Sequence, residues 1–221
     1  VGDIFNWFTS RLAPAMYTAK GDPHANLTRD AEKLRPGESG LLALDWNNGN
    51  RTILVDPLLT GMLLGQTLHS SAPEIYRTLV EATAFGALTI IKRFEEYGVP
   101  VREVINCGGI AEKNPFVMQI YADVSGRPMK ISRSAQTCAL GAAIFGAVVG
   151  GAYPTTERAQ RRMTGVKRTV YRPRKAAAAT YAELYRLYRS LHDAFGTTAH
   201  KGKLYNVMKD LIALRDRVRK G

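Results

Sequence analysis

Residues Val101 to Tyr153 read VREVINCGGIAEKNPFVMQIYADVSGRPMKISRSAQTCALGAAIFGAVVGGAY, and this stretch decides the fold of the chain. An alternating apolar run ends at Cys107 and is followed at once by Gly108 and Gly109. Glycine has no Cβ, so a strand that ends in two glycines before a helix can bring its backbone N–H groups against a phosphate or a flat ring. The same turn also occurs in α/β proteins that hold no ligand, so a plain strand–turn–helix unit is an equal alternative.

Outward from this unit, the hydrophobic periodicity predicts an α/β chain. Asn114 and Pro115 begin a helix that Gly126 ends, because an amide cap followed by proline starts helices and glycine stops them. The helix at 137–149 is rich in glycine and alanine, which we expect where a helix packs very close to a strand or a ligand. The pattern predicts further helices at 1–12, 28–34 with Thr28 as cap, 71–98, 155–163, 176–194 and 204–218, and strands at 40–44, 129–131 and 168–171.

A polar loop and a pair of acidic residues are further candidates for chemistry. The loop at 45–51 reads DWNNGNR, and its Asn-Gly pair is a strong turn signal, so we predict a hairpin loop between Leu42 and Val55. Its Asp, Asn, Arg and Trp side chains would also suit a hydroxyl-rich ligand such as a sugar. Glu74 and Glu81 lie on one face of the predicted helix, where we expect solvated carboxylates and not acid–base catalysis.

The composition is strongly basic. The chain has 221 residues, with 31 Lys and Arg against 19 Asp and Glu and a formal net charge of +12, and it is long enough for one large domain or two small ones. Such a charge fits nucleic acid, an acidic partner domain or a polyanionic small molecule. Much of the excess lies after Pro154, and no basic run carries the interleaved aromatic residues of a nucleic-acid platform. We therefore expect solvated helix faces and no nucleic-acid partner.

The two cysteines, Cys107 and Cys138, stand in apolar, small-residue surroundings without metal-binding spacing. We expect buried thiols in a reducing compartment, which indicates the cytoplasm, with a disulfide between them as the alternative. No apolar run has the length needed to span a membrane. The first residue is Val and not Met, so we expect a piece of a longer protein.

Taken together, these segments resemble the C-terminal domain of the FGGY carbohydrate kinases, and within that family the ribulokinases. The likeness covers about the whole chain. The segment at 107–128 is similar to the family's adenosine loop, and CALGAAIFGA at 138–147 is similar to the helix after it. GDIFNWF at 2–8 and LDWNNGNR at 44–51 are the parts that resemble ribulokinases. The run from Gly61 to Glu81 is similar to a second family signature, from which Gln66, Thr78 and Leu79 depart.

The resemblance implies an actin-like ATPase fold, related to ribonuclease H, in which a mixed sheet is flanked by helices. The chain would be the C-terminal half of a two-domain sugar kinase, with an N-terminally truncated domain at 1–195 and a helical tail at 196–221. ATP with Mg²⁺ would bind mainly to this half, and the ketopentose mainly to the other. Gly141 would allow close helix packing there. The nucleotide would lie against residues carried over from the family motifs, which are Gly61, Gly65, Gly108, Gly109 and, through hydrogen bonding, Asn114.

The family's catalytic Asp stands in a Gly-x-x-Asp-Ala-type motif, and no Asp of this chain has that context. We therefore expect no catalytic residue and no metal ligand in the chain. Phosphoryl transfer needs positioning and charge neutralisation around an in-line attack, so we expect no activity without the N-terminal domain as partner. The apolar face of 1–12 predicts that the isolated chain forms dimers or aggregates. Two alternatives are a non-catalytic actin-like scaffold that binds nucleotide and, from the +12 charge, a nucleic-acid-binding module.

Overall fold

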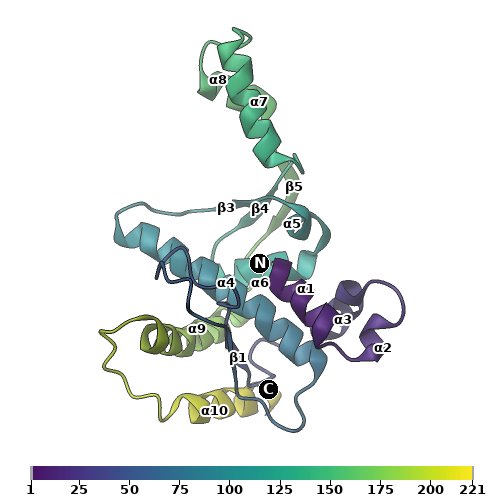
Figure 1. The fold of residues 1–221 in the computed structure, drawn as a ribbon, viewed down its shortest axis with the longest axis vertical. Helices are drawn as coiled ribbons and strands as arrows, with labels where there is room; N and C mark the ends of the chain where they lie inside the picture. The colour runs from purple at the N-terminus through teal and green to yellow at the C-terminus, as the bar shows by residue number, and fades with distance from the viewer. Residues whose placement is uncertain (1, 221) are drawn as a thin grey trace.

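Helix α4 (Ala72–Glu96) runs through the centre of the computed structural model, which describes residues 2–220 (Figure 1). Its start is fixed by Ser71, whose backbone N–H and hydroxyl both donate to the Glu74 carboxylate, at 2.8 and 2.9 Å. Its end is marked by Gly98, whose φ of 78° lies in the left-handed region that stops a helix. The predicted helix and the residues expected to start and end it are confirmed.

Three helices precede the first strand, and the first and third of them pack against α4, while the second packs against the third. They are α1 (Gly2–Arg11), α2 (Ala15–Thr18) and α3 (Pro23–Ala31). The rings of Phe5 and Phe8 from α1 lie 5.8 and 6.2 Å from the ring of Tyr76 on α4, measured between centroids. The Thr28 cap was predicted wrongly, because Asp22 accepts the His24 N–H at 3.0 Å and Pro23 occupies the first turn.

The first sheet has two short antiparallel strands, β1 (Leu42–Leu44) and β2 (Met62–Leu64). Leu42 pairs with Leu64, so the return strand comes after a long connection and not at Val55 as predicted. The Asn48–Gly49 turn forms only local bridges within that connection. The local turn signal does not decide the strand pairing, because the apolar run at 62–64 gives β1 a better partner.

The second sheet is mixed and has the order β3–β4–β5. Its strands are β3 (Val104–Asn106), β4 (Met129–Ser132) and β5 (Val166–Tyr171), with β3 parallel and β5 antiparallel to β4. The crossover from β3 to β4 contains the helices α5 (Gly109–Lys113) and α6 (Pro115–Ser125). Helix α6 fills the layer between this sheet and α4, which gives the predicted mixed sheet flanked by helices.

Helices α7 (Thr137–Val149) and α8 (Thr156–Met163) form a hairpin that projects from the body beyond the β3–β4–β5 sheet (Figure 1). Ile144 is the one buried residue of α7 in the described structure. A Cβ on Gly141 would meet no described atom within 4 Å, so the expected close packing at Gly141 is wrong. Because the hairpin projects, Cys138 is exposed, and Cys107 is exposed beside β3, so the expectation of buried thiols is also wrong.

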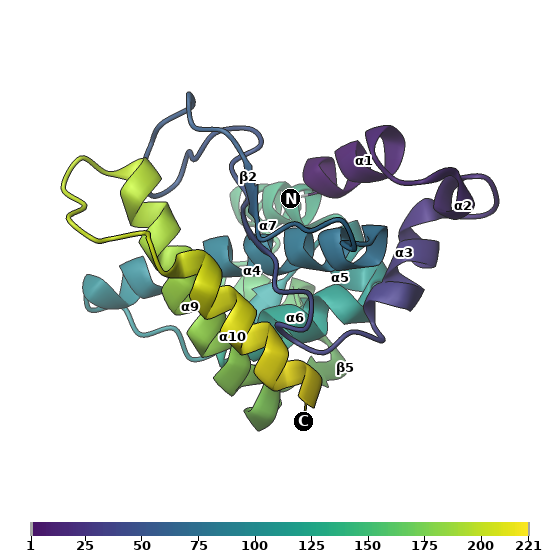
Figure 2. The ribbon, with the colours of Figure 1, turned by 90° about the horizontal axis from the view of Figure 1, so that it is seen from below.

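The last two helices are α9 (Lys175–Gly196) and α10 (Val207–Lys220), and Figure 2 shows α10 lying along α9. The stripe predicted on α9 is buried against α6 and β1, and its tyrosine rings also lie against Phe85 of α4. Leu211 and Leu214 of α10 join the same hydrophobic core. Among residues 2–220, no helix combines the length and apolar character needed to cross a bilayer.

Glu81 is 2% exposed and forms part of a buried polar network, which corrects the expectation of a solvated carboxylate. Its Oε1 accepts hydrogen bonds from Arg77 at 2.7 Å and from the Tyr181 hydroxyl at 2.9 Å. Glu74 is not freely solvated either, because it accepts the two hydrogen bonds from Ser71. A buried charge is tolerated where a partner of opposite charge and further hydrogen bonds compensate its lost hydration.

Candidate functional site

A cavity of about 610 Å³ opens where α1, α3 and α4 meet the β3–α5–α6 segment. We call it the α5 cavity. It brings together two of the residues predicted to bind nucleotide, Gly109 and Asn114, and Gly108 stands directly before Gly109 in the chain. The other walls include Phe5 of α1, His24 and Arg29 of α3, Tyr76 of α4 and Lys113 of α5.

The backbone at Gly108 and Gly109 is uncovered. Gly108 has a φ of 92°, a conformation that residues with a side chain rarely adopt, and it lies two residues after the end of β3. A Cβ placed on Gly108 or on Gly109 would meet no described atom within 4 Å. The space in front of this turn is therefore open to a ligand, and no described side chain fills it.

Asn114 holds the start of α6 in place. Its Oδ1 accepts the Val117 N–H at 3.1 Å, and its Nδ2 donates to the Thr28 hydroxyl of α3 at 3.3 Å. One amide side chain thus caps α6 and ties it to the opposite wall of the α5 cavity. The cap was predicted, whereas the link to Thr28 joins residues 86 positions apart and has no local sequence signal.

The walls of the α5 cavity carry charges of both signs and an aromatic ring. Lys113 and Arg29 bring positive charge, Asp22 and Glu32 bring negative charge, and Phe5 contributes the ring. His24 Nδ1 lies 3.3 Å from the hydroxyl of Tyr76, and burial raises the pKa of that phenol, so it stays protonated. Sequence reasoning missed these residues, although Lys113 stands beside Asn114 in the very segment that was singled out.

Gly61 and Gly65 lie apart from the α5 cavity. Gly61 lines a separate cavity of about 430 Å³ on the other side of α1, next to Trp7 and Phe8. A Cβ on Gly61 would come within 2.6 Å of the Asn47 side chain. Gly65 has a φ of 92°, and a Cβ there would come within 2.3 Å of the Gly40 carbonyl oxygen. Gly65 is thus required by the packing of β2 against the Gly40 backbone, whereas at Gly61 the close atoms belong to the Asn47 side chain.

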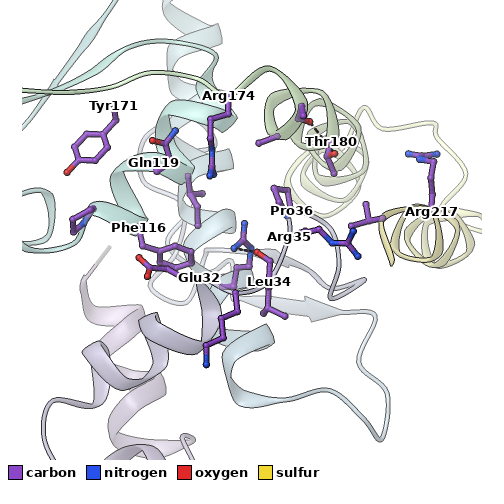
Figure 3. A pocket seen from close by; sticks show the side chains of 17 residues that line it. Glu32, Leu34, Arg35, Pro36, Phe116, Gln119, Tyr171, Arg174, Thr180 and Arg217 are labelled. Atoms are coloured by element: carbon purple, nitrogen blue, oxygen red, sulfur yellow. Dashed lines mark hydrogen bonds between the residues drawn. The ribbon is translucent and has the colours of Figure 1, made fainter. Parts of the chain in front are cut away.

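A larger cleft of about 960 Å³ lies between the α3–β1 connection, α6, α9 and α10 (Figure 3). Its floor includes Phe116, and its rim carries several arginines. These arginines are already paired with acidic residues: Arg174 with Asp123 at 2.6 Å, Arg35 with Glu38 at 3.5 Å and Arg217 with Glu183. The cleft therefore offers less unpaired charge to a ligand than its composition suggests.

The arrangement of the elements matches solved sugar kinases. The xylulose kinase from Rhodospirillum rubrum aligns with a TM-score of 0.73 at 23% identity, over 88% of this chain and 38% of that one. The Plasmodium falciparum glycerol kinase, solved with ADP, aligns with a TM-score of 0.65 at 16% identity, over 86% of this chain and 36% of that one. The chain therefore has the actin-like ATPase fold of the sugar kinases, and the predicted fold class is confirmed.

Residues 1–149 match the model of the FGGY family of carbohydrate kinases, C-terminal domain, and the chain belongs to this family. It is 48% identical to the ribulokinase of Halalkalibacterium halodurans over 224 residues, which cover 97% of this chain and 39% of that protein. It is 41% identical to the ribulokinase of Mycolicibacterium smegmatis over 223 residues, which cover 99% of this chain and 39% of that protein. The chain thus spans about two fifths of the length of these relatives.

Proposed function

We propose that this chain is the nucleotide-binding part of a ribulokinase-like enzyme that transfers the γ-phosphate of ATP to a hydroxyl group of a ketopentose. The observation that carries the proposal is the 48% identity to a ribulokinase along 97% of the chain. The open turn at Gly108 and Gly109 supports the nucleotide side of it. A glycerol kinase that shares the fold was solved with ADP, which is further support.

In this proposal the nucleotide enters the α5 cavity and lies against the backbone of Gly108 and Gly109. Lys113 supplies positive charge near its phosphates, and Asn114 holds the wall that the nucleotide contacts. Gly61 and Gly65 stay predictions as nucleotide-binding residues. Since both pack against protein atoms, we propose that they act by shaping the β2 segment that faces α1.

Mg²⁺ and the catalytic base are part of the proposal, and no described residue is assigned to bind the ion or to act as the base. Within residues 2–220, no three His, Cys, Asp or Glu side chains come together as a metal site. Mg²⁺ bound to ATP neutralises the charge of the transferred phosphoryl group in kinases. We propose that the ion is held by the phosphates together with residues outside this chain, and that an Asp of the N-terminal domain takes the proton of the sugar hydroxyl.

The partner that we propose for this chain is the remainder of such a kinase. Helix α7 exposes Phe145 by 62% and Val149 by 89%, on a projecting element that is almost wholly apolar. A contiguous apolar surface of this kind is typical of a face that another domain covers. A nucleotide between the two domains would then be enclosed on both sides, which excludes water from the reaction.

We place the reaction in the cytoplasm, as a step in the catabolism of arabinose. Both cysteines are free and exposed, and exposed thiols persist in a reducing compartment. Ribulose is the ketopentose that the names of the relatives indicate. Growth of the source cell on arabinose should therefore depend on the complete gene product.

The test has two arms. The complete gene product is assayed with Mg²⁺-ATP against ribulose, xylulose, glycerol and gluconate, and we expect phosphorylation of ribulose with the highest kcat/KM. The 221-residue chain is assayed in parallel and is expected to give no turnover. Turnover by the chain alone would contradict the proposal. ATP binding without any sugar turnover by the complete protein would instead support a non-catalytic scaffold.

A further inference from the structure

A pocket of about 590 Å³ lies on the projecting α7–α8 hairpin (Figure 1). We call it the arginine pocket. Its lining consists of Tyr153 and Pro154 from the turn between the two helices and of Arg158, Arg161 and Arg162 from α8. It shares no lining residue with the α5 cavity. Its volume lies within the range of about 300–1,000 Å³ that is usual for small-molecule sites.

The backbone on both sides of the arginine pocket is held in place. The Tyr153 N–H donates to the Ala147 carbonyl oxygen at the end of α7, at 3.3 Å. Thr155 caps α8, because its hydroxyl oxygen accepts the Arg158 N–H at 3.3 Å. Ala159 is fully buried where α8 packs against α7. The arginine side chains therefore start from a fixed helix beside a fixed turn.

The three arginines are neighbours on α8 although their charges repel each other. Arg158 stands three positions before Arg161 and four before Arg162, which are the spacings at which helix side chains meet, and like charges at these spacings destabilise a helix. Within residues 2–220, none of the three forms an ion pair with an acidic side chain. An anion bound among them would relieve this repulsion.

The acidic residue of α8, Glu157, is engaged at the start of the helix. The pKa of its carboxyl is lowered chiefly by a hydrogen bond from its own backbone N–H, then by one from the Thr155 hydroxyl, and to a smaller extent by the charge of Arg161. The arginine pocket therefore keeps a positive balance. By contrast, the arginines on the rim of the 960 Å³ cleft are paired with acidic residues.

The donors of the arginine pocket suit the oxygen atoms of a phosphate group. A guanidinium group presents five N–H donors in a planar fork that matches two oxygens of one phosphate. Tyr153 lines the same pocket and adds a neutral hydroxyl donor. A nucleic acid would need an extended basic groove with several aromatic side chains for its bases, whereas this pocket has one aromatic ring. A small phosphorylated molecule therefore fits the pocket better than a nucleic acid does.

We propose that the arginine pocket binds a small molecule that carries a terminal phosphate group, through the three guanidinium groups of α8 and the Tyr153 hydroxyl. Such a group occurs on a sugar phosphate and on inorganic phosphate or pyrophosphate, and the test below distinguishes these sources. The site goes beyond the kinase function proposed above, because it lies on a separate hairpin and needs neither ATP in the α5 cavity nor turnover.

The test is titration calorimetry of the 221-residue chain with inorganic phosphate, pyrophosphate and ribose 5-phosphate, at low ionic strength so that salt does not screen the arginines. Saturable binding is expected, and the ligand that binds most tightly identifies the source of the phosphate group. Gly109→Ala, a change in the α5 cavity, should bind that ligand as the parent does. No saturable heat up to about 10 mM of any ligand, or a loss of binding in Gly109→Ala, would overturn the proposal.

Two variants of the arginine pocket extend the test. The first combines Arg158→Gln, Arg161→Gln and Arg162→Gln, since glutamine keeps the helix propensity of arginine, and it is expected to weaken binding at least tenfold. The second is Tyr153→Phe, which keeps the ring and removes one donor, and it is expected to weaken binding about threefold or more. Circular dichroism checks that both fold, and Tyr153→Phe serves alone if the triple variant does not. Parent-like affinity in the folded variants would contradict the proposal.

The matched control separates a site from general attraction to a basic protein. It combines Arg11→Gln, Arg102→Gln and Arg172→Gln, which are exposed arginines on other parts of the chain and remove the same charge. This control should keep most of the affinity. An equal loss in both triple variants would show that the net charge of +12 alone attracts the ligand, and the proposal would be wrong. It would also be wrong if oligothymidine bound through the same arginines more tightly than pyrophosphate does.

Discussion

The Tyr181 hydroxyl donates a hydrogen bond to Glu81 at 2.9 Å, although the two residues are 100 positions apart in the sequence. Arg77 completes a triangle, with its Nε 2.7 Å from Glu81 and its Nη2 2.8 Å from the Tyr181 hydroxyl. The remaining guanidinium nitrogen donates to the carbonyl groups of Ala31 and Leu34. This network joins α4 to α9 and to the end of α3, and α3 and α4 both carry walls of the α5 cavity.

Removing one member of the triangle should destabilise the chain strongly. Glu81→Ala leaves the Arg77 charge buried without its counter-ion, and we expect the free energy of unfolding to fall by about 3–5 kcal/mol. Tyr181→Phe removes hydrogen bonds and no charge, so a loss of about 1–3 kcal/mol is expected. Urea denaturation measures both. The control is Glu96→Ala, at an exposed ion pair with Arg93, which should change stability by less than about 1 kcal/mol.

Gly109→Ala separates nucleotide binding from folding. The added methyl group meets no described atom and lies in a helical turn, so the free energy of unfolding should stay constant or rise slightly. If ATP lies against this backbone, the methyl group displaces it, and the affinity for ATP should fall at least tenfold by calorimetry. Gly146→Ala on α7 is a matched control with equally open surroundings. Equal ATP affinity in Gly109→Ala and the parent would contradict the placement of the nucleotide.

Gly65→Ala, unlike Gly109→Ala, should destabilise the fold. Its φ of 92° and the Gly40 carbonyl oxygen 2.3 Å from the Cβ position force a shift of the β1–β2 pair. We expect a loss of more than about 2 kcal/mol in the free energy of unfolding, which combines backbone strain with a steric clash. Gly126→Ala has a similar φ of 67° but open space, so it should lose only the ~1–2 kcal/mol of the left-handed conformation. Equal losses in the two variants would show that the clash has no effect.

The stability of the chain should depend on pH through two side chains that burial affects, Asp45 and His192. Burial raises the pKa of the Asp45 carboxyl from 3.8 to about 6, so its contribution is present at pH 4 and is lost as the pH rises through 6. Burial lowers the pKa of His192, against the opposing pull of Asp193, so its contribution is present above pH 6.5 and is lost as the pH falls. As the pH rises, the two groups therefore change the free energy of unfolding of the parent chain in opposite directions.

Asp45→Asn removes the pH dependence that the Asp45 carboxyl gives to the free energy of unfolding. At pH 7.5 the variant should gain about 1–3 kcal/mol in the free energy of unfolding, since a shift of one pKa unit corresponds to ~1.4 kcal/mol. Below pH 6.5 only the contribution of His192 still depends on pH, so the free energy of unfolding of the variant should fall steadily as acid is added. Denaturation at a series of pH values between 4 and 8 measures this. A variant profile parallel to that of the parent would show that Asp45 titrates normally.

Self-association should depend mainly on α7. Of the apolar α1 face that the sequence indicated, Trp7 and Leu12 are exposed and the rest is buried in the core, whereas Phe145 and Val149 of α7 are both strongly exposed. Phe145→Ser with Val149→Ser should therefore lower the sedimentation coefficient at high protein concentration towards that of a monomer. Tyr205→Ser, at another strongly exposed aromatic residue, is the control and should have no effect. Parent and α7 variant sedimenting alike would contradict this.

The features that the sequence predicted correctly depend on short-range chemistry. Ser71 and Gly98 at the ends of α4, and Asn114 with Pro115 at the start of α6, act within a few residues of their partners. The buried stripe of α9 is likewise a property of one helix. The resemblance to a kinase family rested on such segments and their order, which is why the fold and the family were predictable.

The features that the sequence left open depend on partners that lie far away along the chain. The local Asn48–Gly49 signal gave the wrong partner for β1, because Met62–Leu64 competes from beyond the loop. Glu81 was expected in solvent, because nothing near it reveals Tyr181. In the α5 cavity, Tyr76 and His24 come from helices that no motif linked to Gly109. The rings of Trp46 and His192 likewise meet only through the tertiary fold.

Helix α4 contributes to the walls of two cavities. Tyr76 lines the α5 cavity, and Gly86, ten positions further along the same uninterrupted helix, lines a cavity of about 240 Å³ beside Trp46. At a rise of about 1.5 Å per residue, the two contact points lie ~15 Å apart along the helix axis. A substitution that tilts or shifts α4 is therefore expected to alter both cavities, although they share no lining residue.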